Sequence, residues 1–215
     1  AYAVEAARTG ASVLVADLDD VQRTSKRWAD HRKANGLKPD IRVELATPRL
    51  AFDMADRADL LVIDTPGWTD GQSLKMAAWA TFCVVPSRGN RMDDLSETVR
   101  LLHAFQAYGI QDWRFGVALN ALRAATAKQD DLDARAYLAD VGFTALPGFV
   151  RDVKDYEIAL LKGLSITETS DAELNKEAFA LMNGIAGAVL QASQSAARDP
   201  TSANLDVKRG KGRRR

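Results

Sequence analysis

Acidic side chains follow two apolar segments of this 215-residue chain. Residues 13–16 (Val-Leu-Val-Ala) run into Asp17 and Asp19, and residues 60–63 (Leu-Leu-Val-Ile) run into Asp64, which starts the turn sequence Asp-Thr-Pro-Gly. Carboxylates are the oxygen ligands that Mg²⁺ prefers, and a carboxylate beside a water molecule can orient that water. The pattern indicates a magnesium site. The competing interpretation is that these residues cap helices and form turns, as Asp, Pro and Gly often do.

Three further apolar runs end in residues that can lie beside these acids. Pro86 with Ser87, then Asn120, and finally Pro147 with Gly148 each follow one run. We therefore expect three carboxylates and an amide side chain along one edge of the fold.

The elements that must position these residues alternate along almost the whole chain. Strands are expected over residues 12–16, 41–46, 60–63, 81–85, 115–119 and 143–146, and helices over 1–9, 23–35, 49–58, 71–80, 93–108, 128–140, 155–161 and 172–191. This alternation predicts right-handed βαβ crossovers and a doubly wound α/β fold, with a mostly parallel sheet and helices on both faces. Ligands of such sheets bind beyond the carboxyl ends of the strands.

Composition excludes several classes of protein. The chain is 47% hydrophobic and 27% charged, which is typical of one folded domain. The single Cys83 excludes an intrachain disulfide and a cluster built on several cysteines, and it favours the cytoplasm. No apolar run approaches the roughly 18 residues of a membrane-spanning helix. We expect a domain over residues 1–192 and a flexible basic tail over 193–215.

The net charge of zero is unevenly distributed. The last eight residues contain six bases and no acid, so the rest of the chain is about six charges negative. A basic tail of this kind suits a polyanion such as nucleic acid, and the competing interpretation is a solvated terminus. The six bases are Lys208, Arg209, Lys211, Arg213, Arg214 and Arg215.

In order and spacing, these segments resemble ParA-type partition ATPases, the deviant-Walker relatives of MinD. The resemblance runs from residue 1 to about 190 and has five parts. They are Val13 to Asp19 with Gln22, Thr24, Ser25 and Trp28; Leu61 to Gly67; Val84 to Ser87 with Asp93, Asp94 and Leu95; Val117 to Asn120; and Leu146-Pro147 through Gly163 to Glu168.

The resemblance implies binding of ATP and Mg²⁺. It implies that Asp17 helps to organise the Mg²⁺ shell, that Asp64 holds Mg²⁺ through a water, and that Asp19 orients the attacking water. By the same resemblance, the Gly67 amide senses the γ-phosphate and Asn120 contacts the adenine edge. Pro147 belongs to the late part of the nucleotide site.

The family's partners are also implied by the resemblance. They are a homodimer when ATP is bound, non-specific DNA, and a ParB-like centromere-binding protein that stimulates hydrolysis, in a cytoplasmic, nucleoid-associated protein. Arg151 and Lys154 of the late block, together with the tail, are the candidate DNA contacts, although solvated helix surface is the simpler interpretation of either residue alone. A MinD-like positioner that touches lipid is less favoured, because the terminus has almost no apolar face.

One departure from the family bears on activity. The phosphate loop, Lys-Gly-Gly-x-x-Lys-Thr, does not occur in the chain, nor does the strand that precedes it. That loop supplies amides and lysines that cradle phosphates. We expect an amino-truncated piece of a longer ATPase, without hydrolysis of its own and with an apolar slot in its sheet. The alternative is a non-hydrolysing scaffold that has lost the loop. A smaller departure is Asp19-Asp20-Val21-Gln22, where Asp-Pro-Gln is commoner.

Overall fold

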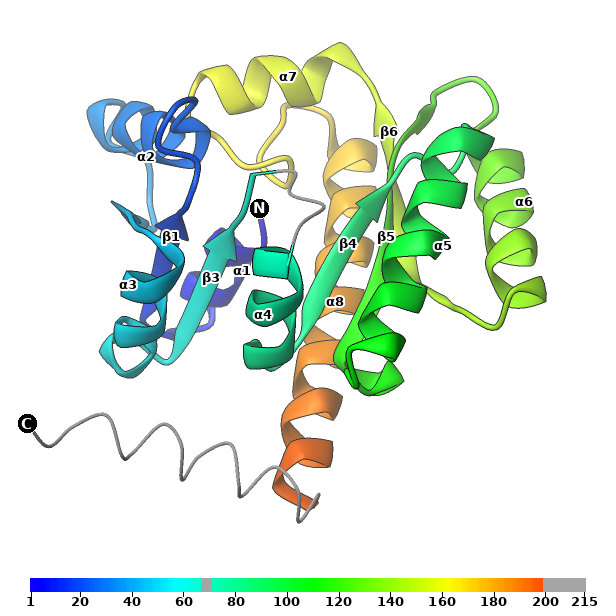
Figure 1. Ribbon diagram of the computed structural model, residues 1–215. Coiled ribbons are helices and arrows are strands. Elements are labelled where there is room, and N and C mark those ends of the chain that lie inside the picture. The colour runs from blue at the N-terminus through cyan, green and yellow to red at the C-terminus, as the bar shows by residue number, and fades with distance from the viewer. Residues whose placement is uncertain (67–70, 199–215) are drawn as a thin grey trace, which may run out of the picture.

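The computed structural model describes residues 1–66 and 71–198, and six strands form the framework of this part. They are β1 (Val13–Asp17), β2 (Arg42–Leu45), β3 (Leu60–Asp64), β4 (Cys83–Ser87), β5 (Phe115–Arg123) and β6 (Ala145–Asp152). The strands form two sheets, with the orders β2-β1-β3 and β4-β5-β6 (Figure 1). Every pairing among them is parallel, which confirms the predicted α/β class.

The helices lie close to their predicted positions. They are α1 (Tyr2–Arg8), α2 (Thr24–Ala34), α3 (Pro48–Asp53), α4 (Gly71–Trp79), α5 (Met92–Ala107), α6 (Ala127–Asp140), α7 (Lys154–Leu161) and α8 (Ala172–Arg198). The last helix runs to Arg198 rather than ending near Gln191. Within the described residues, no helix combines the length and the apolar character that crossing a membrane requires.

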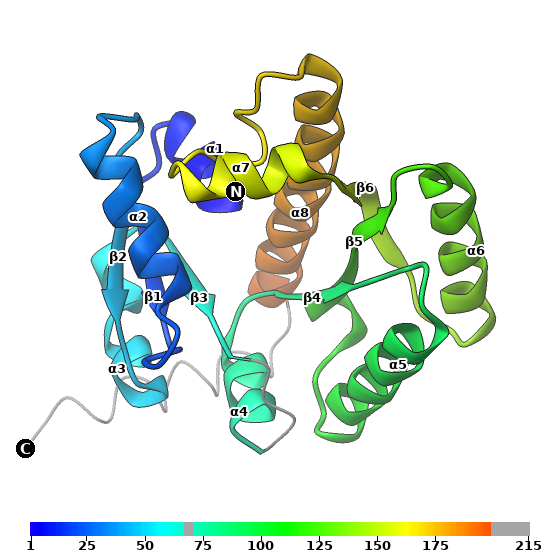
Figure 2. The ribbon, with the colours of Figure 1, turned by 90° about the horizontal axis from the view of Figure 1, so that it is seen from above.

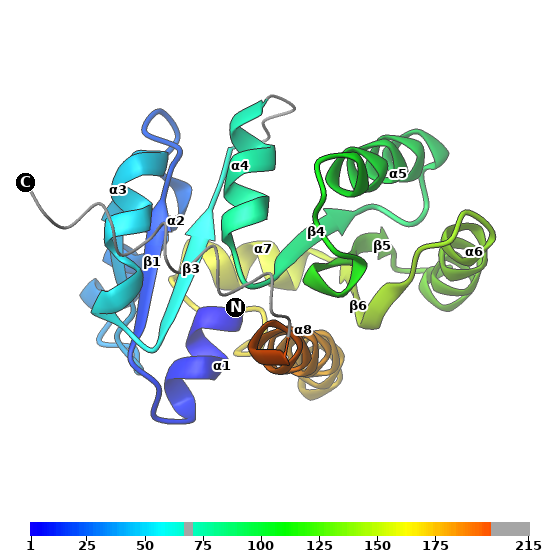
Figure 3. The same cartoon turned by 60° about the horizontal axis from the view of Figure 1, so that its bottom comes forward.

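Helices cover both faces of each sheet. On the first sheet, α1 and α2 pack on one face, and α3 and α4 pack on the other. On the second sheet, α5 and α6 cover one face, and α7 and α8 cover the other. Figure 3 shows α4 and α5 on one side of the strands and α1 and α8 on the opposite side. This is the doubly wound arrangement that the alternation of elements predicts.

The two sheets are not joined by strand pairing. No backbone ladder links β3 to β4 in the described part of the chain, although both strands point toward the same edge (Figure 1). The apolar residues 60–63 of β3 are only half-buried, and Val84 of β4 is 38% exposed. Parallel strands covered on both faces are normally fully buried. The facing edges of β3 and β4 therefore line an apolar interruption of the kind expected from the sequence.

Two helices bridge the interruption. On one face, α4 contributes Met76 to the core of the first sheet and Ala77 to that of the second. On the other face, α1 contributes Val4 to the first core, and Tyr2 packs against the second. Apolar packing through helices thus replaces the missing ladder between the two halves.

A buried ion pair makes a third connection between the halves. Arg32 of α2 is fully buried, and its guanidinium donates to Glu168, in the segment before α8, at 2.7 and 3.0 Å. The same guanidinium donates to the carbonyl oxygens of Gly163, Lys38 and Pro39 at 3.0, 2.7 and 2.8 Å. All five N–H groups of the arginine therefore have acceptors, as a buried charge requires.

Close backbone contact surrounds this ion pair. Gly163 has a φ of +76°, and a Cβ there would lie 2.3 Å from the backbone nitrogen of Arg32. Only glycine allows the end of α7 to approach α2 so closely. Figure 2 shows α7 lying between α2 and α8, across the interruption between the sheets.

Loss of the Glu168 charge should destabilise the whole fold. Burial alone would raise the pKa of Glu168, but hydrogen bonds from Arg32 and the Ser165 amide outweigh it and hold the pKa below the ordinary value of 4.5. We expect Glu168→Gln to lower the free energy of unfolding at pH 7 by about 3 kcal/mol, because Arg32 is left without a buried counter-charge. Urea unfolding monitored by circular dichroism measures this.

The pH dependence and a control test the cause. A lowered pKa stabilises the native state above pH 4.5, and this contribution is lost as pH falls through the folded pKa, so the wild-type and variant curves should converge in acid. Glu97→Gln removes the exposed Glu97–Arg100 pair and should change stability by less than about 0.5 kcal/mol. A Glu168→Gln variant as stable as wild type at pH 7 would contradict the assignment.

Candidate nucleotide-binding edge

Asp17 and Asp64 end two strands that lie side by side. Asp17 is the last residue of β1 and Asp64 the last of β3, and the two are register partners in a parallel pair. Neighbouring strands are separated by about 4.8 Å, and register partners project from the same face. The carboxyl edge of the first sheet therefore presents two adjacent acidic side chains.

The amino end of α2 holds both carboxylates. The Ser25 hydroxyl donates to Asp64 Oδ2 at 2.6 Å, and the Lys26 amide donates to Asp17 Oδ2 at 3.0 Å. The residue before α2, Arg23, has a φ of 51° and makes no side-chain cap. Asp17, which is 1% exposed, thus supplies the acceptor that a helix start needs. The helix-capping interpretation of Asp17 is correct as far as this contact goes.

Asp19 forms the turn between β1 and α2. One of its oxygens, Oδ1, accepts from the amides of Gln22 and Val21 at 2.8 and 3.2 Å. Its own amide donates to Asp17 Oδ1 at 3.1 Å. The side chain is half-buried at the same edge, and within the described residues its second oxygen accepts no hydrogen bond. Asp19 is therefore positioned by the turn while one oxygen stays available.

The edge has an excess of negative charge. No basic side chain forms an ion pair with Asp17, Asp19 or Asp64 in the described ranges, and the Lys26 ammonium pairs with Asp30 instead. The same ranges contain no group of three or more His, Cys, Asp or Glu placed to hold a metal. Two carboxylates and a serine hydroxyl suit Mg²⁺, which is commonly held by one or two carboxylates together with substrate phosphates. Asp17 and Asp64 are the residues here that would hold it.

Comparison with known proteins identifies the fold. No protein-family profile and no curated protein sequence matches the chain. Its structure is similar to that of the MinD cell division protein of Aquifex aeolicus, with a TM-score of 0.65 and 11% identity over 86% of this chain and 89% of MinD. Apo McdA of Cyanothece is similar to the same degree, with a TM-score of 0.65 and 14% identity over 86% of this chain and 91% of McdA. The chain has the MinD-type fold.

Two predicted residues of the edge are corrected by this MinD-type structure. Asn120 does not follow its strand, because β5 continues to Arg123 through an irregular register around Ala121, whose φ is 51°. Pro147 does not follow its strand either, because β6 extends to Asp152. Pro147 instead lies against α8, where a Cβ on Gly184 would be 2.5 Å from its carbonyl oxygen. Pro147 therefore lies within the sheet, away from the carboxyl edge.

Asn120 retains an exposed side chain, but in the middle of a strand rather than at its end. The bulge lets β5 run three residues further, so Arg123 forms the strand end and pairs with Asp130 at 2.7 Å. A role for Asn120 at a nucleobase stays a prediction.

The remaining predicted residues divide into two groups. Gly67 and the tail bases Lys208, Arg209, Lys211, Arg213, Arg214 and Arg215 lie outside the described residues. Arg151, at the end of β6, is half-buried, and its Nε donates to Glu177 at 2.8 Å. Lys154 is exposed in the first turn of α7. Lys154 is therefore better placed than Arg151 to meet a phosphate.

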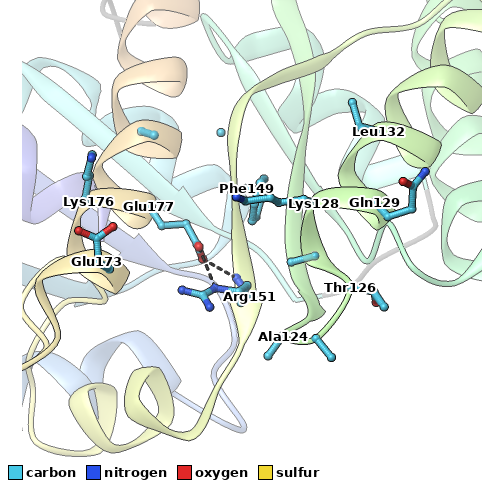
Figure 4. A pocket seen from close by; sticks show the side chains of 14 residues that line it. Ala124, Thr126, Lys128, Gln129, Leu132, Phe149, Arg151, Glu173, Lys176 and Glu177 are labelled. Atoms are coloured by element: carbon cyan, nitrogen blue, oxygen red, sulfur yellow. Dashed lines mark hydrogen bonds and ion pairs between the residues drawn. The ribbon is translucent and has the colours of Figure 1, made fainter.

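A separate groove of about 820 Å³ lies along the outer side of β6. Figure 4 shows its walls, with α8 on one side, α6 on the other, and Phe149 and Arg151 of β6 between them. Arg151 faces Glu177 across this groove rather than the acidic edge. Asp17, Asp19 and Asp64 are not among the residues that line it.

Sequence reasoning missed Ser25 and Arg32 as members of the structure around the edge. Ser25 follows a motif residue and looks like a helix-start residue, so only the geometry shows that it binds Asp64. Arg32 lies three residues after the buried Ala29, and a charged residue at that helical spacing is the signal that could have marked it as buried.

The capping role of Asp17 yields a test. Both of its oxygens accept backbone N–H groups, and an amide replacement can offer only one oxygen. We expect Asp17→Asn to lower the free energy of unfolding by about 1–3 kcal/mol, the cost of a buried donor without an acceptor. Thermal and urea unfolding measure it.

The neighbouring Asp20 provides the matched control, since its side chain is exposed. Asp20→Asn should leave the unfolding midpoint within error of wild type. Equal midpoints for the Asp17→Asn and Asp20→Asn variants would show that the α2 contact contributes nothing.

Proposed function

We propose that this protein is a ParA-like positioning ATPase that takes Mg-ATP at the edge formed by Asp17 and Asp64. The observation that carries the proposal is the register pairing of these acids at the carboxyl ends of neighbouring parallel strands. Such edges are the ligand sites of open α/β sheets. Support also comes from the shared fold, because one solved structure with it, at a TM-score of 0.57, is an ATP complex of McdA.

The proposal assigns each acid a part in phosphoryl transfer, which depends on positioning and charge neutralisation. Bound Mg²⁺ would supply charge neutralisation at the phosphates, and Asp17 and Asp64 would hold it. Asp19 has an oxygen free of hydrogen bonds and would orient the attacking water. Gly67 would meet the γ-phosphate, and Asn120 the base.

Hydrolysis in this proposal also requires a phosphate loop, a motif that the 215 residues do not contain. We therefore expect the 215-residue chain to show no ATP turnover above the rate in buffer. A product of the same reading frame that carries a Gly-rich, Lys-containing loop ahead of α1 should bind Mg-ATP and hydrolyse it slowly. Isothermal titration and phosphate release measure the two properties.

Variants of the loop-bearing product test the assignments. Asp64→Asn should weaken Mg-ATP binding about tenfold, Asp19→Ala should abolish turnover with binding retained, and Asp20→Asn should change neither. Binding that is indifferent to Asp64→Asn would contradict the site. Turnover by the 215-residue chain that Asp19→Ala abolishes would contradict the requirement for the loop.

We further propose that the ATP-bound form is a homodimer that binds DNA without sequence preference and responds to a ParB-like partner. The charge of the tail supports DNA as the polyanion, because six bases occur in eight residues. Each phosphate contact adds about 0.9 to the slope of log K against log salt. Deleting residues 208–215 should flatten that slope by several units, while Lys154→Gln should flatten it by about one. An unchanged slope after the deletion would exclude the tail.

A MinD-like role is the second candidate, since MinD and McdA match the chain equally well, with TM-scores of 0.65. Sedimentation with anionic lipid vesicles separates it from the ParA-like role. A third candidate, a non-hydrolysing scaffold, is supported by the missing loop motif. Failure of a loop-bearing product to bind nucleotide would favour the scaffold.

A further inference from the structure

Helix α2 is tied at both ends to parts of the molecule that are far apart in the sequence. At its start, Ser25 and Lys26 donate hydrogen bonds to Asp64 and Asp17. Toward its end, it contacts the segment 161–168, which joins α7 to α8. About ten residues separate these ends, which corresponds to about 15 Å along a helix axis.

The contacts at the far end are polar and numerous. The Trp28 indole donates to the carbonyl oxygen of Leu164 at 3.0 Å, and the Asn35 amide donates to that of Lys162 at 3.0 Å. His31 Nδ1 lies 2.9 Å from the carbonyl oxygen of Leu161. With the Arg32–Glu168 pair, these contacts attach one face of α2 to successive carbonyls of the 161–168 segment.

The segment in turn fixes the start of α8. Glu168 accepts from the Ser165 amide at 2.7 Å, and Asn175 of α8 accepts from the Thr169 amide at 2.8 Å. The Asn175 side-chain amide donates back to the Thr169 carbonyl at 2.8 Å. A displacement of α2 along its axis cannot occur without straining this chain of contacts.

The near end of α2 is held by the atoms that the proposed function assigns to Mg²⁺. Asp64 Oδ2 accepts the Ser25 hydroxyl and Asp17 Oδ2 accepts the Lys26 amide, so these oxygens can take up a cation only by sharing or releasing those donors. Ser25 is the weaker tie, because a hydroxyl can rotate away and a backbone amide cannot.

We propose that α2 couples the acidic edge to the connection between α7 and α8, with Ser25 as the positioning residue at the edge. Release of Ser25 from Asp64 loosens the start of α2, and the rigid helix passes this change to residues 161–168. By linkage, a change at 161–168 alters the edge to the same extent. The inference rests on the proposed function only for the identity of what occupies Asp17 and Asp64.

Hydrogen exchange on the 215-residue chain without nucleotide tests the coupling directly. We expect Ser25→Ala to raise amide exchange in peptides covering 161–168 about fivefold, the factor for one net hydrogen bond. Ser25→Thr retains the hydroxyl and should restore wild-type exchange. The matched control is Ser96→Ala, which removes a hydroxyl bonded only to the Asp93 carbonyl in its own helix.

A reciprocal variant completes the test. Trp28→Phe removes the bond to Leu164 while keeping an aromatic ring, and it should speed exchange of the Lys26 amide about fivefold. Changes confined to residues 17–27 in Ser25→Ala, together with an unchanged Lys26 amide in Trp28→Phe, would overturn the coupling. If Ser25→Ala exchanges faster throughout α5 and α6 as well, global unfolding is the cause, and Trp28→Phe decides.

Since no nucleotide is present, failure of ATP binding leaves this experiment unaffected. Failure of the coupling leaves the assignment of Asp17 and Asp64 untouched.

Discussion

The buried ion pair between Arg32 and Glu168 is the contact on which the arrangement of this molecule depends. The two three-stranded sheets share no ladder among the described residues, so packing through helices and this pair must hold them in relation. A guanidinium with all five N–H groups bonded is compatible with complete burial, whereas the same group without Glu168 would be an uncompensated charge. The pair also sets the approach of α7 to α2 at Gly163.

Separation of the sheets explains why the acidic edge is already formed without a continuous sheet. Asp17 and Asp64 belong to the same three-stranded unit, and their register is set by the β1–β3 ladder alone. The helix that caps them, α2, packs on that unit too. The second sheet reaches this region only through α1, α4 and the contacts of residues 161–168. Nucleotide chemistry at the edge would therefore act on one half, and α2 would carry its effects to the other.

Much of the fold could be predicted from the sequence, because its strands are short apolar runs between clear helical patterns. The convergence of Asp17 and Asp64 followed from the same rule, since parallel strands end at one edge. The positions of Asn120 and Pro147 could not be predicted in this way. A bulge with a positive φ at Ala121, a residue without glycine's freedom, extends β5, and β6 accommodates Pro147 as an edge strand. These are tertiary effects that local propensity does not contain.

Arg32 and Glu168 show a second limit. Each looks like a solvated surface charge in sequence, and they are separated by 136 residues. Only the folded backbone, with glycine at position 163, brings them together and excludes water. The separate groove along β6 was likewise invisible, because its lining comes from α6, α8 and two strand ends.

Paramagnetic broadening in NMR spectra of the 215-residue chain with Mn²⁺-ATP tests the central claim most directly, because it detects weak binding and locates it. The account predicts that the broadened amides centre on residues 17–26 and on Asp64, while those of Leu132 and Phe149 in the β6 groove stay sharp. Broadening centred on the groove, or spread evenly over the chain, would contradict a nucleotide site at the acidic edge.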